Sequence, residues 1–496
     1  MNSEFKAKLI NKFQSLASLE QLFVTTSGIF IFLILLNLIT GNWVAPRVRD
    51  FSWKNQQIGA KDKSFMLTFN RPVEHSSVEA NLKIEPLLPG KISWMGNKMA
   101  YTLTQPPLYE NSYEIQLKGA KSKQDLETEV NSFQTEFPTR DRAFAYIGVE
   151  AEEQGRLILY NLTQQKKTVL TPGELVIVDF ESYPNGEKIL FSALNKNDKT
   201  QDLGSQKLYT VTTGINFADP EKAQPSGKIK EILDSENYYN LEFDLAADGK
   251  NIVVRRVNQK NATDFGLWLI GESGKPESLG IQGGKIKIAP DGKTVAVTQT
   301  EKVAIASLNP EPPPDTATSG KIFSGYDQIL AYDQTINQTI LVKNNPDYTA
   351  SLFILNQQGE AQKILTTART IIECELEPKK EKTLYCLTSQ TRANQPEALT
   401  FITAINLETA EIIDLLALPS QGEAQINISP DGIGLLFDRL APATEVDNET
   451  LTTEDGIAIA TGRLWLLPLP ETLNNENLQN LAPQELVPGF HPHWLP

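Results

Sequence analysis

The chain has 496 residues but only two cysteines and three histidines. The cysteines, Cys374 and Cys386, have neither the spacing of a zinc ribbon nor that of a CxxC redox pair. The sequence also lacks a GxSxG nucleophile elbow, an HExxH metal helix, a P-loop and a dinucleotide-binding fingerprint. We therefore expect a protein that is not an enzyme, with no catalytic residues, no cofactor and no metal site.

Positive charge is also in short supply. The chain has 46 Lys and Arg residues against 61 Asp and Glu residues, which gives a formal net charge of −15. Residues 47–139 are nearly balanced, so the acidic excess falls in residues 140–496. Such a surface repels phosphate backbones, and no basic stripe opposes it. The sequence therefore excludes nucleic acid as a favoured partner.

Long hydrophobic runs are absent except for one near the N-terminus. No charged residue occurs from Gln21 to Pro46, and Leu22–Ile39 forms an apolar segment inside this stretch. At 1.5 Å per residue, such a helix would just cross a bilayer core, and Trp43 would lie at the interface. The sequence predicts one transmembrane helix over residues 21–44. A cleaved signal peptide is the alternative, disfavoured because Pro46 would follow the cut.

Residues 1–20 precede this run and predict a short amphipathic helix on the cytoplasmic face, with a frayed tail as the alternative. Its apolar and basic positions are Phe5, Leu9, Phe13 and Leu16, with Lys6, Lys8 and Lys12 between them. Basic residues are balanced on the two sides of the run, but long domains translocate largely regardless of such charges. We expect a single-pass membrane protein with a cytoplasmic N-terminus and its folded domains on the periplasmic, lumenal or extracellular side.

Residues 47–139 form the first folded unit. Short alternating segments such as Ser64–Asn70 are separated by turns at the spacing of a β-sandwich. The unit resembles the bacterial Ig-like domain of surface-layer and other cell-envelope proteins, and that resemblance implies a spacer or adhesive module. The residues that carry it are Phe69–Val73, Ser77–Val78, Pro86–Trp94, Pro107–Leu108 and Tyr113–Leu117.

Residues 140–496 repeat one plan, in which two apolar strands flank a tight turn and two further strands follow. Four of the turns contain Asn-Gly or Asp-Gly, at residues 185–186, 248–249, 291–292 and 431–432. We expect tight turns whose two central residues both have positive φ. The six repeats are Val176–Asn195, Leu241–Asn258, Ile286–Gln299, Ile329–Asn344, Ile371–Thr388 and Ile426–Leu440.

A seventh unit is split between the two ends of this region. Residues 142–172 supply a second, a third and a fourth strand, and residues 489–496 resemble a missing first strand. A composite blade of this kind closes the ring and removes its exposed edges. The fold class predicted is therefore all-β, with a seven-bladed β-propeller and an Ig-like sandwich, preceded by one transmembrane α-helix.

The repeats resemble the TolB-type propeller family, whose signature is S-P-D-G between the first two strands of a blade. Ser429–Gly432 matches the signature fully, whereas Pro290–Gly292 and Asp248–Gly249 match in part. Propellers of this type usually mediate protein–protein contacts, and a minority are enzymes. The resemblance therefore implies a binding platform.

A few residues are candidates for special roles. Cys374 and Cys386 are nearly symmetric about a predicted turn, which allows either a cross-strand disulfide or two buried thiols. His491 and His493 would share one strand face as metal ligands can, although two polar positions on a closing strand are the favoured interpretation. Among innermost strands, Asp179 and Asp244 are the acids expected to face the axis. The long insertions 309–320 and 441–456 are candidate binding loops, or surface loops without a role.

The sequence favours a non-catalytic scaffold that displays its propeller to a membrane or envelope protein. The first alternative is a hydrolase or lyase that acts on glycans in the propeller channel. The second is a cell-wall tether in which residues 47–139 are the adhesive part.

Overall fold

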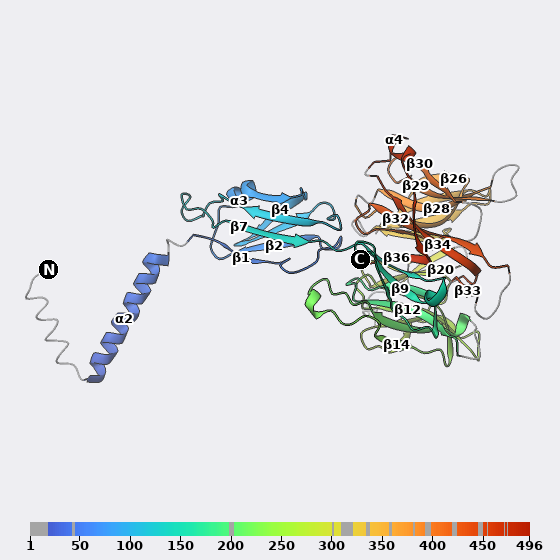
Figure 1. Cartoon of the computed structure of the whole chain (residues 1–496), viewed down its shortest axis with the longest axis horizontal. Coiled ribbons are helices and arrows are strands. Elements are labelled where there is room, and N and C mark those ends of the chain that lie inside the picture. The colour runs from blue at the N-terminus through green and yellow to red at the C-terminus, as the bar shows by residue number, and fades with distance from the viewer. Residues whose placement is uncertain are drawn as a thin grey trace, which may run out of the picture.

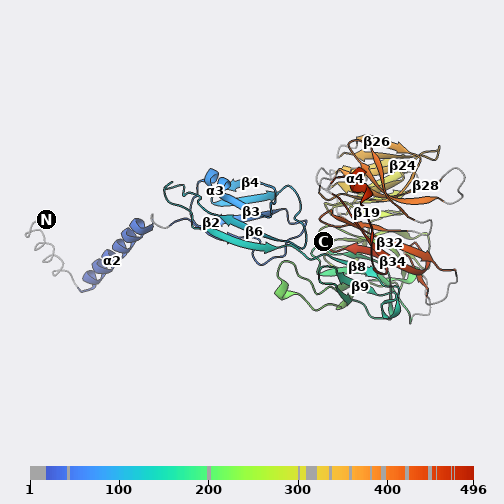
Figure 2. The ribbon, with the colours of Figure 1, turned by 45° about the horizontal axis from the view of Figure 1, so that its top comes forward.

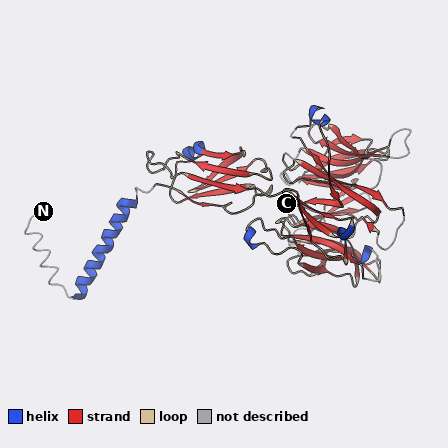
Figure 3. Cartoon of the chain, viewed as in Figure 1, coloured by secondary structure: helices blue, strands red, loops and turns tan. Residues whose placement is uncertain are grey.

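The computed structural model describes residues 18–496 except 42–44, 198–202, 300–301, 309–320, 334–337, 357–359, 380–381, 392–397, 419–423, 445–449, 454, 471 and 474. It shows one long helix, a small β-unit and a large β-unit in chain order (Figures 1 and 3). The predicted amphipathic segment lies almost wholly outside the described residues, and so does the insertion 309–320.

The apolar run lies in helix α2 (Ser18–Gly41). The helix forms as predicted, but the predicted membrane anchor has to be corrected. Within the part of the chain that is described, no helix is both long enough and apolar enough to cross a membrane. Polar residues interrupt α2 at Thr25–Ser27 and again at Asn37. The unbroken apolar stretch Ile29–Leu36 is therefore shorter than the roughly 20 residues that a span requires. The predicted single-pass localisation, with a transmembrane helix over residues 21–44, is wrong on this finding.

The smaller β-unit consists of two sheets that pack on one core. Phe65, Leu67 and Phe69 alternate with exposed or half-buried neighbours, so one face of their strand is buried. Aromatic rings fill the space between the sheets, with the Trp53 and Phe137 ring centroids 5.1 Å apart. One sheet has the order β1 (Val48–Phe51), β2 (Ser64–Phe69), β5 (Lys98–Leu103), β4 (Gly90–Met95); the other has β3 (Leu82–Glu85), β6 (Ser112–Leu117), β7 (Phe133–Pro138), and α3 (His75–Asn81) precedes β3.

The larger β-unit is a ring of seven antiparallel sheets, here called blades (Figures 1 and 2). Their middle strands are buried on both faces, as in β12 and β28, because each blade packs between two neighbours. Blade 1 is β11 (Leu175–Ser182), β12 (Lys188–Asn195), β13 (Lys207–Thr212), β14 (Ile229–Leu233); blade 2 is β15 (Tyr238–Leu245), β16 (Ile252–Asn258), β17 (Phe265–Ile270), β18 (Pro276–Ser278). Blade 3 is β19 (Ile286–Ile288), β20 (Thr294–Gln299), β21 (Lys302–Ser307), β22 (Lys321–Ser324); blade 4 is β23 (Gln328–Asp333), β24 (Gln338–Asn344), β25 (Ala350–Leu355), β26 (Ala361–Thr367).

The remaining blades complete the ring. Blade 5 is β27 (Thr370–Leu376), β28 (Thr383–Gln390), β29 (Leu399–Asn406), β30 (Ile412–Leu418). Blade 6 is β31 (Ile426–Ile428), β32 (Gly434–Pro442), β34 (Ala458–Pro468), β35 (Gln484–Pro488), with β33 (Leu451–Thr452) paired to β34. The closing blade is β36 (Phe490–Trp494), β8 (Ala143–Ile147), β9 (Leu157–Asn161), β10 (Lys166–Val169), so the last strand of the chain pairs with β8. Short helices lie in the connections: η1 (Ala151–Glu153), η2 (Leu203–Ser205), η3 (Pro220–Lys222) and α4 (Asn475–Gln479).

The Asn-Gly and Asp-Gly turns differ from the predicted type. Only the glycine has positive φ, at 70° for Gly186 and 68° for Gly432, and the Asn or Asp before it does not. The Gly432 N–H donates to the Ser429 carbonyl at 2.8 Å, which closes a four-residue turn before the chain enters the second strand. The prediction of two positive φ values is therefore wrong, because these are longer turns that place a single glycine in the left-handed region.

The structure also shows how the cysteine pair and the insertion 441–456 are arranged. Cys374 and Cys386 lie directly opposite on β27 and β28 and form a disulfide, with an S–S distance of 2.01 Å. The described part of the insertion 441–456 is an extension of the β32–β34 hairpin, and it includes β33. The turn that ends strand 1 of blade 6 contacts the smaller β-unit through Asp431, and β33 lies on the opposite face of the propeller (Figure 1).

Candidate functional site: the propeller axis

The innermost strands carry acidic pairs that the sequence analysis found only in part. Each pair has the form acid-x-acid: Asp179 and Glu181 on β11, Glu242 and Asp244 on β15, Glu373 and Glu375 on β27. Residues two apart on a strand share a face. The expectation that the axis holds Asp179, Asp244 and few others is thus corrected.

A β-bulge stands directly before each acidic pair. The strand register shifts between Ile177 and Asp179, between Asn240 and Glu242, and between Ile371 and Glu373. A bulge adds one unpaired residue and turns the following side chains to a new direction. Simple alternation along the strand therefore misjudges which of these residues face the axis, whereas the recurring acid-x-acid pattern would have identified them.

Several of these carboxylates accept backbone hydrogen bonds from the next blade. Glu181 Oε2 accepts from the Leu245 N–H at 2.7 Å, which joins blade 1 to blade 2. Glu242 Oε1 accepts from the Ile286 N–H at 3.2 Å, and Asp244 accepts from the Ile288 N–H, which joins blade 2 to blade 3. Innermost strands lack a ladder partner on the axial side, so these N–H groups need acceptors from elsewhere.

The same pattern continues on the other side of the ring. Glu375 Oε2 accepts from the Ile428 N–H at 2.6 Å, and its Oε1 accepts from the Asn427 amide at 2.8 Å. Asn427 Oδ1 in turn accepts from the Trp494 N–H at 2.7 Å on the closing strand. A further contact joins the closing blade to blade 1, where His491 Nε2 lies 3.2 Å from Asp179 Oδ1. We call this set of contacts the axial stitches.

Burial controls the charge state of the stitching acids. It raises the pKa of Glu181 well above its usual value, and the neighbouring Asp244 charge adds to the effect. Burial likewise raises the pKa of Glu375, against the hydrogen bond from the Ile428 N–H. For Lys287, burial alone would lower the pKa, but the charges of Asp244 and its acidic neighbours outweigh burial and raise it. The axis therefore has a lysine ammonium among acids that resist ionisation.

A cavity of about 260 Å³ occupies the axis on the face away from the smaller β-unit. Its wall contains Glu242, Lys285, Lys287 and Glu373, together with Asp455 from the β33–β34 connection. A second cavity of about 110 Å³ shares Glu242, Lys285 and Asp455 with the first. Lys287 is exposed and lines the larger cavity. This combination of acids and lysines can receive polar or charged groups of a ligand.

The two C-terminal histidines lie beside this axis and pack on one aromatic ring. The His491 and His493 rings are 6.5 Å apart, and both lie next to Phe180, at 5.0 Å and 6.1 Å. Burial lowers the pKa of His493 to about 4, and the neighbouring His491 adds to this shift. Within the described ranges, no cluster of His, Cys, Asp and Glu side chains has the geometry of a metal site.

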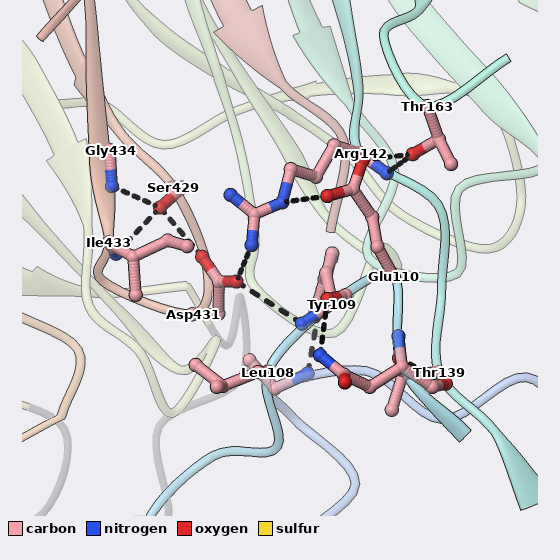
Figure 4. Close-up of polar contacts among 12 residues, drawn as sticks. Leu108, Tyr109, Glu110, Thr139, Arg142, Thr163, Ser429, Asp431, Ile433 and Gly434 are labelled. Atoms are coloured by element: carbon pink, nitrogen blue, oxygen red, sulfur yellow. Dashed lines mark hydrogen bonds and ion pairs between the residues drawn. The ribbon is translucent and has the colours of Figure 1, made fainter. Parts of the chain in front are cut away.

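The opposite rim of the propeller is joined to the smaller β-unit by a polar contact, here called the clasp (Figure 4). Asp431, 1% exposed, follows Pro430 in the S-P-D-G turn of blade 6. Its Oδ2 lies 2.8 Å from Arg142 Nη2 and accepts from the Tyr109 N–H at 3.2 Å, while its Oδ1 accepts from the Ser429 hydroxyl at 2.8 Å. Arg142 also contacts Glu110 Oε2 at 3.0 Å.

A second contact fixes the smaller β-unit to blade 1. The Gln57 N–H donates to the Phe217 carbonyl at 2.9 Å, and the Arg140 guanidinium lies 4.0 Å from the Phe217 ring centroid. Arg140 is buried and pairs with Asp62 Oδ2 at 3.0 Å. The smaller β-unit is thus held at two separate points, on blade 1 and on blade 6, and two contacts restrict its rotation relative to the propeller more than one contact would. The two β-units therefore meet in a defined orientation.

No family model matches the chain, and no curated protein matches it either. Similar solved structures include TolB from Acinetobacter baumannii, which is 9% identical with a TM-score of 0.40 over 86% of each chain. A putative 6-phosphogluconolactonase from Bacteroides fragilis is 12% identical with a TM-score of 0.44 over 72% of this chain and 98% of that one. An oligogalacturonate lyase from Vibrio parahaemolyticus is 13% identical with a TM-score of 0.30 over 67% and 71%. TolB proteins and other propellers are thus among the solved structures that this chain resembles in fold.

Proposed function

We propose that this chain is a non-catalytic binding protein that docks another protein through the propeller face opposite the smaller β-unit. In this proposal the smaller unit is an Ig-like spacer, and the partner is a protein of the cell envelope. The observation that carries the proposal is the clasp. It holds the Asp431 rim of the propeller against residues 109–142 and leaves the face with the axial cavity open.

The axial stitches support a role without catalysis. A general acid or base must have a free proton-transfer position that points to its substrate. Glu181, Asp244 and Glu375 instead direct carboxylate oxygens at backbone N–H groups of the next blade. Each therefore has at least one oxygen bound to the next blade, and breaking that hydrogen bond would cost about 1–3 kcal/mol. Their placement is better explained by closure of the ring.

The open face has the properties of a docking surface. Its centre is a cavity of about 260 Å³ whose polar wall could receive one or two side chains of a partner. Asp455 lies at its mouth on the β33–β34 connection and is exposed. Loops on a rigid scaffold are common positions for binding residues. We therefore place the partner over the axis, in contact with the β32–β34 hairpin.

The proposal is tested by cross-linking the tagged full-length chain in its own cells and identifying what copurifies. We expect one stoichiometric protein partner, reduced at least tenfold by Asp455→Lys at the open face. Asp248→Lys makes the same charge change on an exposed turn of the clasp rim and should leave recovery unchanged. Equal loss in both variants, or recovery of no partner with wild type, would contradict docking through the open face.

The alternative function is a glycan hydrolase or lyase with its site in the axial cavity. Glu242 and Glu373 are two acids of its wall, and the two oxygens of Glu242 accept from the Ile286 N–H and from Arg255 Nε. Incubation of the purified full chain with acidic and neutral polysaccharides would reveal new reducing ends or unsaturated products. Turnover that Glu373→Gln abolishes, in a variant that melts like wild type, would replace the binding proposal with this enzyme.

A further inference from the structure

We propose that a third cavity on the open face, between blades 5 and 6, binds a carboxylate group through Arg439. The cavity has a volume of about 240 Å³. Arg439, Arg463 and Trp465 line one wall, and Thr400, Thr461 and the buried Asp438 complete its polar lining. It adjoins the axial cavity, since Ala424 lines both.

Two arginines lie directly opposite each other on neighbouring strands of blade 6, and in the described part of the chain only one of them has carboxylate partners. Arg439 on β32 is the direct cross-strand partner of Arg463 on β34. Like charges directly opposite on an antiparallel pair are destabilising. Arg463 is compensated, since its Nη2 lies 3.0 Å from Glu150 Oε1 and its Nε lies 3.8 Å from Glu485 Oε1.

Arg439 has no such compensation. Among the residues that the structure describes, it has no ion-pair partner, and its guanidinium lies 5.5 Å from the centroid of the Trp465 ring. The side chain is exposed. An aromatic face positions the planar guanidinium while leaving its N–H edge open to an acceptor. A guanidinium held in this way is suited to bidentate contact with a carboxylate.

The charge balance of the cavity favours a single negative charge. Its lining has two cationic groups, Arg439 and Arg463, and one acid, Asp438, whose oxygens accept from the Gln425 and His491 N–H groups at 2.8 Å. A doubly charged phosphate would meet more repulsion from Asp438, Glu150 and Glu485 than a carboxylate would. The hydroxyl groups of Thr400 and Thr461 can donate to the second carboxylate oxygen.

The carboxylate could come from an acidic side chain of the docked protein or from a small free acid. Only the first source rests on the proposed function, and the binding of a carboxylate can be tested without a partner. Two probes separate the sources: sodium glutarate, and a neutral-capped pentapeptide with one central glutamate flanked by glycines. Binding of the full chain to each probe is measured by calorimetry at low and at physiological salt.

We expect millimolar or tighter binding of at least one probe, weakened by added salt. Arg439→Gln should lower the affinity at least tenfold. Arg439→Lys should lower it less, because lysine keeps the positive charge but lacks the two parallel N–H donors of the guanidinium. Arg49→Gln, an equal charge change on the exposed face of the smaller β-unit, should bind like wild type. Preference for the peptide assigns the site to a partner's side chain, and preference for glutarate assigns it to a free acid. Failure of wild type to bind either probe, or equal binding by Arg439→Gln, would overturn the proposal.

Discussion

Asp431 Oδ2 lies 2.8 Å from Arg142 Nη2, although the two residues are 289 positions apart in the chain. The same turn position in the other blades has a different role. Asp248 Oδ1 accepts from the Lys250 N–H at 3.0 Å, and Asp291 Oδ1 accepts from the Lys293 N–H at 2.9 Å, so both stabilise only their own turns. Asp431 contacts its own turn through Oδ1, which accepts from the Ser429 hydroxyl, and its Oδ2 joins the propeller to the smaller β-unit.

Loss of the clasp acid should destabilise the protein far more than loss of its counterpart in blade 2. Asp431→Ala removes the buried acceptor of Arg142 Nη2 and of the Tyr109 N–H, although Arg142 Nε keeps Glu110, so we expect a loss of roughly 2–4 kcal/mol in the free energy of unfolding. Asp248→Ala removes one exposed turn hydrogen bond and should cost about 0.5–1 kcal/mol. Urea unfolding measures both values. Equal losses of stability in the two variants would show that Asp431 stabilises only its own turn and that its contacts with Arg142 and Tyr109 add nothing.

The axial stitches predict that an acceptor, not a charge, is needed at Glu375. Burial raises its pKa, so the folded protein gains little from ionisation there. Glu375→Gln keeps one oxygen for the Ile428 N–H but loses the acceptor of the Asn427 amide, so it should lower the free energy of unfolding by about 1 kcal/mol. Glu375→Ala leaves that N–H unsatisfied and should cost about 1–3 kcal/mol more. If Gln and Ala variants were equally unstable at neutral pH, the carboxylate charge itself would be essential.

Two buried groups give opposite pH dependences. Burial raises the pKa of Asp438 to about 6, so the folded state holds its proton more tightly than the unfolded state does. Its contribution to stability is present below pH 4 and lost as the pH rises through 6, with a size of about 3 kcal/mol. His493 has a lowered pKa of about 4, so its contribution is present above pH 6.5 and lost as the pH falls toward 4.

Removal of Asp438 should therefore expose the effect of His493. We expect Asp438→Asn to lose more stability than wild type when the pH is lowered from 6.5 to 4. His493→Gln should lose less than wild type over the same range. Chemical denaturation at half-unit pH steps gives the three curves. The assignment of the two groups fails if the curves of both variants run parallel to that of wild type.

The Cys374–Cys386 disulfide closes a loop with a sequence separation of 12 in blade 5. Closure of a loop of this length restricts the unfolded chain, and we expect a contribution of about 2–3 kcal/mol to stability. A reducing agent should lower the melting temperature of wild type. The Cys374→Ala, Cys386→Ala double variant should already melt at the lower temperature and be insensitive to the reductant. A wild type that is equally insensitive would show that the bond contributes no stability.

The repeated features of the fold could be predicted from the sequence because they depend on local patterns. Alternating apolar residues and glycine-containing turns indicate the blades, and the strand at residues 489–496 is the first strand that residues 142–172 lack. The sheet order places β36 beside β8, as that pattern predicts. The apolar run near the N-terminus was misjudged because its hydrophobic length was counted across Thr25–Ser27 and Asn37.

The candidate site was harder to predict because it depends on contacts between distant segments. Bulges before Asp179, Glu242 and Glu373 change the direction of these side chains, and alternation alone cannot reveal such a change. The clasp could not be predicted because Asp431 and Asp248 both precede the glycine of a blade turn, and the sequence does not show which of these turns the smaller β-unit contacts.

The central claim is that the clasp fixes the smaller β-unit on one rim and leaves the opposite face of the propeller open. It is tested most directly by spin labels at Lys91→Cys and Lys363→Cys, both exposed, with the distance distribution between them measured by electron–electron double resonance. We predict one narrow distribution, unchanged by Asp248→Ala and broadened by Asp431→Ala. A broad distribution without the Asp431 substitution, or a narrow one that survives it, would contradict the claim.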